Sequence, residues 1–126
     1  MADAMFEVTP DRDLRMLRIA LRGFWTRETM SDYLKVVRDG MASLQRSGGC
    51  KYILIDMTQL PIQSQEIAEA HAAQLRVVKQ MGGIRVALIM QSALSKLQAA
   101  RVAADTGQKT FDTEEAAQDG LLADGV

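Results

Sequence analysis

The sequence predicts one α/β domain, built on a mixed, mostly parallel sheet of four to five strands with about four helices. Three observations indicate this class. Two segments near the N-terminus alternate apolar and polar residues, as strands with one covered face do. Two later runs are almost continuously apolar, which is typical of strands covered on both faces. Segments with helical spacing separate these runs, and such alternation requires parallel strands joined by right-handed crossovers.

The composition is that of an ordinary globular domain. The chain has 126 residues, of which 48% are hydrophobic and 25% charged, and a domain of this length buries a core without staples. Fifteen basic and 16 acidic residues give a formal charge of -1, which excludes the strong positive field of a nucleic-acid-binding protein. Cys50 is the single cysteine, and residues 1–5 lack the features of a signal peptide. We therefore expect a cytoplasmic protein without a membrane span or a nucleic-acid partner.

The first two strands are predicted to form an antiparallel hairpin. Residues 5–9 alternate, residues 10–13 have the composition of a turn, and residues 14–22 alternate again. The second strand places apolar and more polar residues on opposite faces, with Leu17, Ile19 and Leu21 against Arg18, Ala20 and Arg22. Glu7 is expected to pair across the hairpin with one of those arginines.

The first helix is predicted to begin after Gly23-Phe24-Trp25-Thr26. Thr26 is a typical N-cap with Glu28 in the first turn, and Trp25 and Met30 have the spacing of a hydrophobic staple. Apolar residues then recur at helical spacing, namely Met30, Tyr33, Leu34, Val37, Met41 and Leu44. Ser47-Gly48-Gly49 ends the helix.

The rest of the chain continues the alternation of strands and helices. Residues 51–57 and 84–90 are the two covered strands, and a helix from about Ser64 to Met81 between them completes a βαβ unit. An Ala-rich helix is expected from about Ser92 to Asp105. A short strand-like segment over residues 108–111 and a last helix over residues 113–122 follow, with acidic residues at the positive end of that helix.

Four short motifs, together with the order of elements, carry a resemblance to a known family. They are Gly23-Phe24-Trp25-Thr26 before the first helix, Asp56 closing a covered strand, Leu97–Asp105 in the third helix, and Phe111–Ala116 opening the last. The chain resembles the STAS domain, and within it the bacterial branch of sporulation anti-sigma-factor-antagonist-like proteins, over about residues 6–122. The resemblance implies a non-enzymatic module that binds a protein partner or a ligand. In the antagonists a kinase-like partner phosphorylates a serine near the start of the second helix.

The phosphorylation motif is where this chain departs from the family pattern. The motif reads Asp-Ser-Ser-Gly or similar, after a strand ending in Asp-Leu-Ser, whereas this strand ends in Asp56-Met57-Thr58. The spacing puts Ser64 where the acid of the motif stands and Gln65 where the acceptor serine stands. Ser64 and Thr58 are therefore the candidates for phosphorylation.

Polar residues that follow the two covered strands form a candidate rim. Ligands of open α/β sheets bind outside the carboxyl ends of the strands. Asp56 either faces a ligand there or hydrogen-bonds the loop that follows it. Ser64 is either a plain N-cap or a phosphoryl acceptor. The candidate rim consists of Asp56, Thr58, Gln59, Ser64, Gln91 and Ser92.

His71 is the single histidine, and it lies on a helical stripe with Ile67, Leu75 and Val78. It either sits at the edge of the core or contacts a ligand. A catalytic dyad with Ser64 is excluded, because their separation along one helix is roughly 10 Å. One histidine and one cysteine cannot supply a zinc site, and no nucleotide-binding or metalloprotease motif occurs. We expect no metal, no cofactor and no enzyme activity.

Two classes of function stay open. The first is a STAS-like regulatory module that binds a protein through the candidate rim. The second is a carrier or sensor of a small apolar or amphipathic ligand, because related folds include the CRAL-TRIO lipid-transfer domains. The eight methionines bear on this alternative, since Met30, Met41, Met81 and Met90 either line an adaptable groove or fill the core. A hydrolase or transferase built on Asp56 and His71 ranks last, because no motif supports it.

Self-association is a further expectation, and it rests on the N-terminal hairpin. The hairpin is predicted to present an unpaired sheet edge, and Phe24 and Trp25 are predicted to add apolar surface at its end. A homodimer is therefore expected.

Overall fold

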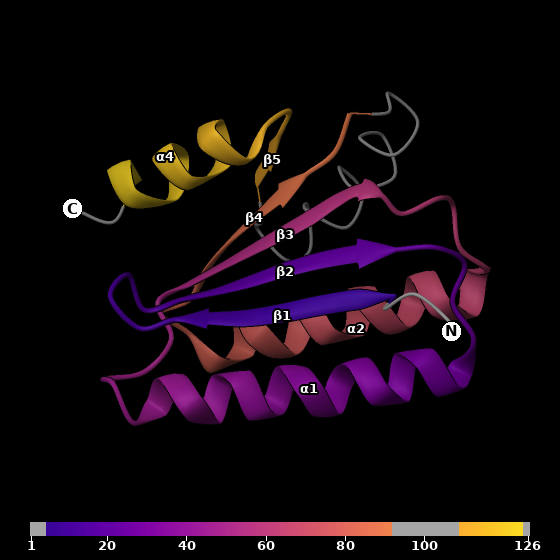
Figure 1. Ribbon diagram of the computed structural model, residues 1–126, viewed down its shortest axis with the longest axis horizontal. Coiled ribbons are helices and arrows are strands. Elements are labelled where there is room, and N and C mark those ends of the chain that lie inside the picture. The colour runs from indigo at the N-terminus through magenta and orange to yellow at the C-terminus, as the bar shows by residue number, and fades with distance from the viewer. Residues whose placement is uncertain (1–4, 92–108, 125–126) are drawn as a thin grey trace.

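The computed structural model describes residues 5–91 and 109–124, which form a five-stranded sheet with three helices (Figure 1). The strands are β1 (Phe6–Asp11), β2 (Met16–Arg22), β3 (Tyr52–Gln59), β4 (Arg85–Ile89) and β5 (Lys109–Phe111), and the helices are α1 (Arg27–Gln45), α2 (Gln65–Met81) and α4 (Glu114–Asp124). The sheet order is β1-β2-β3-β4-β5, with β1 antiparallel to β2 and all other pairs parallel. This confirms the predicted mixed, mostly parallel sheet. The helix expected over Ser92–Asp105 lies outside the described residues.

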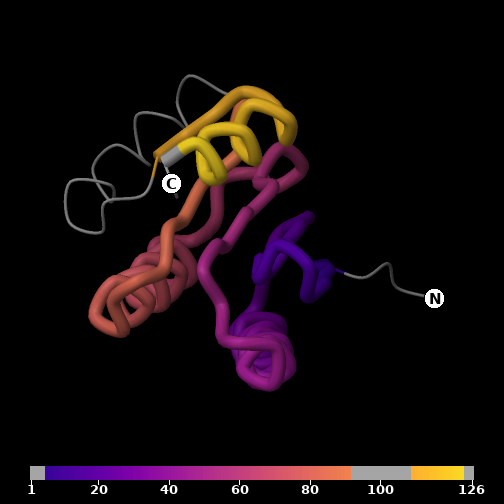
Figure 2. Tube along the Cα trace, turned by 90° about the vertical axis from the view of Figure 1, so that its left-hand side faces the viewer, coloured from indigo at the N-terminus to yellow at the C-terminus, as the bar shows by residue number. Residues whose placement is uncertain are grey.

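The two faces of the sheet carry different helices. Helices α1 and α2 lie on one face and α4 lies on the other, as Figure 2 shows. We call these the α1/α2 face and the α4 face. Successive residues of a strand point to opposite faces, so in β2 Leu17 faces the helices α1 and α2 while Arg18 faces α4.

Each face has its own hydrophobic core. The core of the α1/α2 face is the larger, and its fully buried side chains include Leu17, Leu21, Trp25, Tyr33 and Leu44. The core of the α4 face consists of Met16, Tyr52, Leu54, Ala87, Ile89, Ala117 and Leu121. Strand β3 supplies both cores, which confirms that it is covered on its two faces. Neither α1, α2 nor α4 is both long and apolar enough to cross a membrane.

Strand β1 extends further than the sequence predicts. Pro10 and Asp11 belong to the strand and not to the turn. The Arg22 amide donates to the Met5 carbonyl at 2.8 Å, and the alternation of an antiparallel ladder then places the Pro10 nitrogen on the outer edge. A proline costs no ladder hydrogen bond at that position. The turn begins later, where the amide of Leu14 donates to Asp11 Oδ1 at 3.2 Å.

The predicted helix starts agree with the structure. The Thr26 hydroxyl accepts from the Thr29 amide at 3.2 Å, and the Ser64 hydroxyl accepts from the Ile67 amide at 3.3 Å. Both residues are N-caps of the expected type. Helix α1 approaches the sheet closely at Gly40, where a Cβ atom would lie 2.7 Å from Leu17 Cδ1. This contact explains a glycine inside a helix that otherwise favours larger residues.

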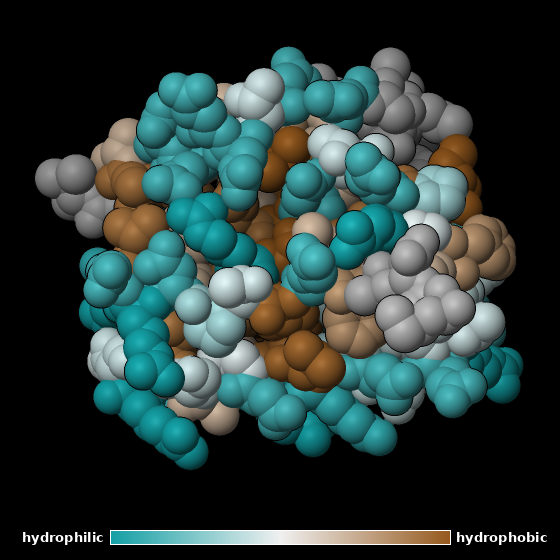
Figure 3. Space-filling view, in the orientation of Figure 1, coloured by the Kyte–Doolittle hydropathy of each residue, from teal (hydrophilic) through white to brown (hydrophobic). Residues whose placement is uncertain are grey.

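The end of the hairpin exposes less apolar surface than the sequence predicts. Trp25 is only 1% exposed and its Nε1 donates to the Arg22 carbonyl at 2.7 Å, so the expectation that it lies on the surface is wrong. Phe24 is 61% exposed. The difference follows from the helix start, because the staple position before the N-cap packs inward. Figure 3, which views the molecule from the side of β1, shows hydrophobic side chains in the middle of this face between hydrophilic ones.

Candidate functional site

The loops that follow β2 and β3 lie together at the carboxyl end of the sheet, on the right in Figure 1. Gln63 joins them. Its Oε1 accepts from the Trp25 amide at 2.8 Å, and its Nε2 donates to the carbonyls of Gly23 at 2.9 Å and Pro61 at 2.8 Å. The Gly23 amide also donates to the Gln59 carbonyl at 3.3 Å. The two loops therefore form one hydrogen-bonded unit.

Asp56 is engaged with the loop that follows it. Its Oδ1 accepts from the Thr58 amide at 2.9 Å and from the Thr58 hydroxyl at 2.7 Å. Of the two interpretations of Asp56, the structure shows the loop-stabilising one. The same side chain lines a polar pocket on the α4 face.

The other rim residues do not converge on Asp56. Ser64 is exposed and caps α2, which packs on the opposite face of the sheet. Beside it, Arg27 Nε lies 2.6 Å from Glu66 Oε1 and links the starts of α1 and α2. Gln91 is exposed, and its Nε2 donates to the Asp112 carbonyl at 3.4 Å. Ser92 lies outside the described residues, and Gln59 contributes its backbone to the joined loops.

Two large apolar side chains are exposed at this end of the sheet, of which Phe24 was expected from the sequence and Ile62 was not. Ile62 is 52% exposed in the loop after β3, and Phe24 is 61% exposed in the loop joined to it. The sequence contains a signal for the exposure of Ile62. This residue stands between Pro61 and Gln63 in a polar loop, which belongs to neither a strand nor a helix that could bury it. The candidate rim therefore presents two large apolar side chains in addition to its polar ones.

The polar pocket on the α4 face has a volume of about 150 Å³. It is lined by Glu7, Thr9, Arg18, Ile19, Ala20, Leu54, Asp56 and Glu114. The Arg18 guanidinium lies 3.5 Å from Asp11 Oδ2 and 3.3 Å from Glu114 Oε1, and it donates to Gln118 Oε1 at 2.6 Å. Its charge is thus neutralised inside the protein. Residues 5–91 and 109–124 contain no group of three or more side chains that could hold a metal ion.

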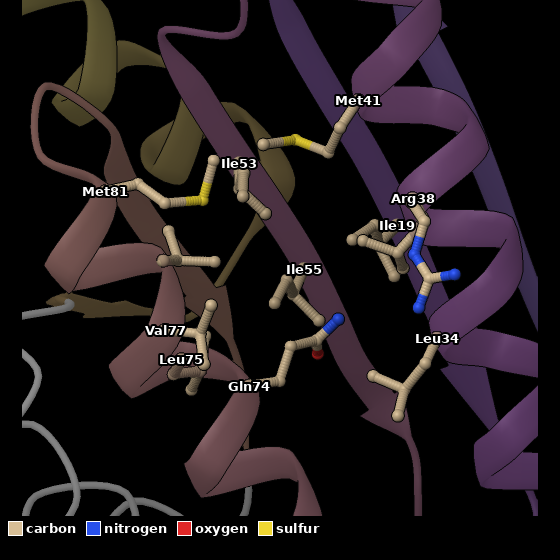
Figure 4. Close-up of a pocket in the computed structure, with 12 residues that line it drawn as sticks. Ile19, Leu34, Arg38, Met41, Ile53, Ile55, Gln74, Leu75, Val77 and Met81 are labelled. Atoms are coloured by element: carbon tan, nitrogen blue, oxygen red, sulfur yellow. The ribbon is translucent and has the colours of Figure 1, made fainter.

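An apolar hollow lies between α1 and α2, and Figure 4 shows the side chains that surround it. Strands β2 and β3 form its floor, α1 and α2 its walls, and its volume is about 230 Å³. We call it the helix groove. Its lining consists of Ile19, Leu34, Val37, Arg38, Met41, Ile53, Ile55, Gln74, Leu75, Val77, Val78 and Met81. Ten of these twelve side chains are apolar, so the groove is suited to hydrocarbon.

Both expected uses of methionine occur. Met30 and Met90 are 5% and 4% exposed and belong to the core, whereas Met41 and Met81 line the helix groove. Met81 is 60% exposed and Val77 is 56% exposed. The lip of the groove on α2 therefore leaves hydrocarbon in contact with water, which a bound apolar molecule would remove.

One end of the helix groove adjoins a buried aromatic cluster. The His71 ring lies 4.8 Å from the Trp25 ring and 5.5 Å from the Tyr33 ring, measured between centroids. Tyr33 Oη and His71 Nε2 are buried, and within the described part of the chain neither makes a well-formed hydrogen bond. Burial lowers the pKa of His71 to about 4, so its imidazole is neutral at pH 7. The histidine sits at the edge of the core.

Gln74 connects this cluster with the groove. The Gln74 side chain adjoins the Tyr33 hydroxyl. Burial raises the pKa of that hydroxyl, and the neighbouring Gln74 side chain opposes the rise. Gln74 also lines the helix groove. A polar side chain thus separates the apolar groove from two buried polar atoms without good partners.

Cys50 has the environment of a structural cysteine. Its Sγ donates to the Tyr52 carbonyl at 3.2 Å, and burial raises the pKa of the thiol. A thiol with a raised pKa is a poor nucleophile at neutral pH. Cys50 is therefore a half-buried structural residue.

Comparisons with known proteins identify the fold. No family model matches the chain, and no curated protein matches it. The chain is similar to the crystal structure of an uncharacterised protein of the DUF3478 family, with a SpoIIAA-like fold, from Shewanella loihica PV-4. The TM-score is 0.67, the identity is 20%, and the match covers 96% of this chain and 98% of that one. The fold is SpoIIAA-like. This confirms the STAS-like architecture that the order of elements and the motifs indicate.

Proposed function

We propose that this STAS-type module is a non-enzymatic binding protein that holds a small apolar or amphipathic ligand in the helix groove. The observation that carries the proposal is the groove itself, an apolar hollow of about 230 Å³ that opens to solvent between α1 and α2. It belongs to the carrier or sensor class of function, one of the two that the sequence leaves open. The SpoIIAA-like fold accommodates it without any catalytic constellation.

The walls and floor of the groove suit such a ligand for different reasons. Ile53 and Ile55 stand on the central strand β3 and are 2% and 4% exposed, so the floor is rigid. Met41 and Met81 are flexible and polarisable, and they adapt to the shape of a hydrocarbon. The volume is below the roughly 300–1,000 Å³ of pockets for drug-sized ligands. The groove is therefore expected to hold a slender chain and not a fused ring system.

Blocking the groove tests this proposal. Val77→Trp places a large side chain at an exposed lining position, where it can cover the groove without disturbing the core. Diphenylhexatriene, a neutral and slender apolar dye, is expected to bind the unmodified protein. It is expected to bind the variant at least about tenfold more weakly, which corresponds to a loss of about 1.4 kcal/mol in binding free energy. The measurement is a fluorescence titration, with circular dichroism to verify folding.

Val36→Trp is the matched control, because Val36 is also an exposed helical valine but does not line the groove. It is expected to bind the dye as the unmodified protein does. Equal dye affinity in the Val77→Trp and Val36→Trp variants would show that the dye binds elsewhere, and the proposal would then be withdrawn.

Phe24 and Ile62 favour a second function, the binding of a protein partner at the candidate rim. Both large apolar side chains are more than half exposed, and Gln63 holds their loops together. Apolar side chains surrounded by a polar rim are typical of protein interfaces. The family resemblance suggests a kinase-like regulator as the partner, with Ser64 or Thr58 as the residue that is phosphorylated. The alternative partner is a second copy of this chain, which would form a homodimer.

The double variant Phe24→Ser, Ile62→Ser tests the second function. A partner that binds through the rim is expected to be retained from the native lysate by the unmodified protein and by the Val36→Ser control, but not by the double variant. Intact-mass measurement of the protein from its own cells reports phosphorylation, and sedimentation at high concentration reports the dimer. Identical retention by all three proteins would exclude the rim as the interface.

A further inference from the structure

We propose that the helix groove selects an anionic amphiphile, a single hydrocarbon chain with a carboxylate head, and that Arg38 and Gln74 bind that head. This inference rests on the proposed function and names the ligand class of the same site. It is carried by the distribution of charge and of hydrogen-bonding groups around the groove.

Arg38 is the first observation, because it is the one charged residue among the twelve that line the groove. Its side chain is exposed, and Figure 4 shows its guanidinium beside α1, on the side of that helix that faces α2. No ion pair joins it to another residue in the described segments, whereas Arg18, Arg22 and Arg27 all pair with carboxylates. The groove thus carries a positive charge that no carboxylate of residues 5–91 or 109–124 pairs with.

Gln74 is the second observation, because it supplies a hydrogen-bond donor on the facing wall. Figure 4 shows its amide directed from α2 toward α1, across the floor residue Ile55. A guanidinium binds both oxygens of a carboxylate in its planar fork, and an amide NH₂ group adds a further donor. A carboxylate between the two helices would therefore find donors from both walls.

The orientation of the ligand follows from the polarity of the two ends. Gln74 adjoins the buried hydroxyl of Tyr33, which is 0% exposed and lacks a well-formed hydrogen bond. The other end is lined by Met41 and Met81 and carries no polar side chain. A polar head belongs at the first end and the hydrocarbon at the second, since burying an unpaired carboxylate among methionines is costly.

Three probes of equal chain length separate head-group recognition from apolar binding. They are decanoate, decanol and decyltrimethylammonium, each used below its micelle concentration to displace diphenylhexatriene. The unmodified protein is expected to bind decanoate roughly tenfold more tightly than decanol, because a hydrogen bond to a charged group in a partly exposed site has this magnitude. The cationic probe is expected to bind more weakly than decanol. Raising the salt concentration should weaken the binding of decanoate and of neither other probe.

Arg38→Met tests the residue, because it keeps an apolar stem in the groove and removes the charge. We expect it to abolish the preference for decanoate, so that decanoate no longer binds more tightly than decanol. Lys35→Met removes an exposed cation of α1 that does not line the groove, so it should keep the preference. Arg38→Lys should retain part of it, since a lysine keeps the charge without the planar fork.

The outcomes distinguish the two proposals. Suppose that Val77→Trp weakens the binding of all three probes, and that the unmodified protein binds decanoate and decanol with equal affinity. The groove then binds apolar ligands, and the head-group inference is wrong. The inference is also wrong if Arg38→Met and Lys35→Met lower decanoate affinity alike, because general surface charge would then account for the effect. If Val77→Trp changes the binding of no probe, both proposals fail.

Discussion

The two faces of the sheet differ in how completely their side chains find partners within the protein. On the α4 face, polar residues of β1 and β2 are joined in ion pairs, and Arg18 has carboxylate or amide oxygens from three residues around it. On the α1/α2 face, α1 and α2 leave an apolar hollow that is lined by Arg38, for which the described segments supply no ion-pair partner. The charged side chains of the first face therefore have partners within the protein, whereas the second face leaves hydrocarbon in contact with water. This difference is why the proposed ligand is assigned to the incompletely covered face and not to the more highly charged one.

The largest expected effect tests whether the α1/α2 face carries the stability of the fold. Leu17 of β2 is 0% exposed and belongs to its core. Leu17→Ala should lower the free energy of unfolding by about 2–5 kcal/mol, because it removes buried methyl groups and leaves a cavity. Urea denaturation measures this. A smaller loss for Leu17→Ala than for an Arg18→Met variant would reverse the comparison of the two faces.

Acid should weaken the same face through His71. Burial lowers its folded pKa to about 4, below the ordinary value of 6.5, so the unfolded chain binds the proton more readily. The stability from the neutral imidazole is full above pH 6.5 and is lost as the pH falls toward 4. The expected loss from pH 7 to pH 4 is about 3 kcal/mol.

His71→Leu isolates this contribution, because the carboxylates of the protein titrate in both forms. Denaturation at several pH values should show a shallower loss of stability in the variant between pH 6.5 and pH 4. Parallel curves for the two proteins would mean that the histidine is accessible to water in the native state, and the aromatic cluster would then not be sealed.

The smallest expected effect concerns the α4 face. Arg18→Met removes the partner of Asp11 and Glu114 while keeping the aliphatic stem over the sheet. Because these ion pairs are partly exposed, the expected loss is below about 1 kcal/mol, and high salt should reduce it further. The measurement is again urea denaturation. A loss as large as that of Leu17→Ala would show that the charged network holds the sheet together.

The sequence predicted the sheet and the described helices well, because hydrophobic periodicity and caps are local signals. Thr26 and Ser64 cap their helices as expected, and Glu7 pairs with Arg22 at 3.4 Å. The turn after β1 was placed too early, because a proline usually ends a strand and Pro10 is tolerated only on the outer edge. Local composition cannot tell an edge from an interior strand.

The candidate site was harder to predict than the fold. The carboxyl ends of the strands could be named from the order of elements, but the helix groove depends on the distance between α1 and α2. That distance reflects how two helices pack on one sheet, and no residue of either helix encodes it alone. Met41 and Met81 were recognised as groove candidates, whereas Arg38 gave no signal because a helical arginine ordinarily faces water.

The bridging position of Gln63 has a consequence for hydrogen exchange. Its side chain holds the Trp25 amide and the Gly23 carbonyl from the other loop, so neither loop can open without releasing the other. The amide of Trp25 should therefore exchange with solvent deuterium at the rate at which the loop after β3 detaches, although 38 residues separate the bonded pair in the chain. Two connections that are distant in sequence would behave as one cooperative opening unit.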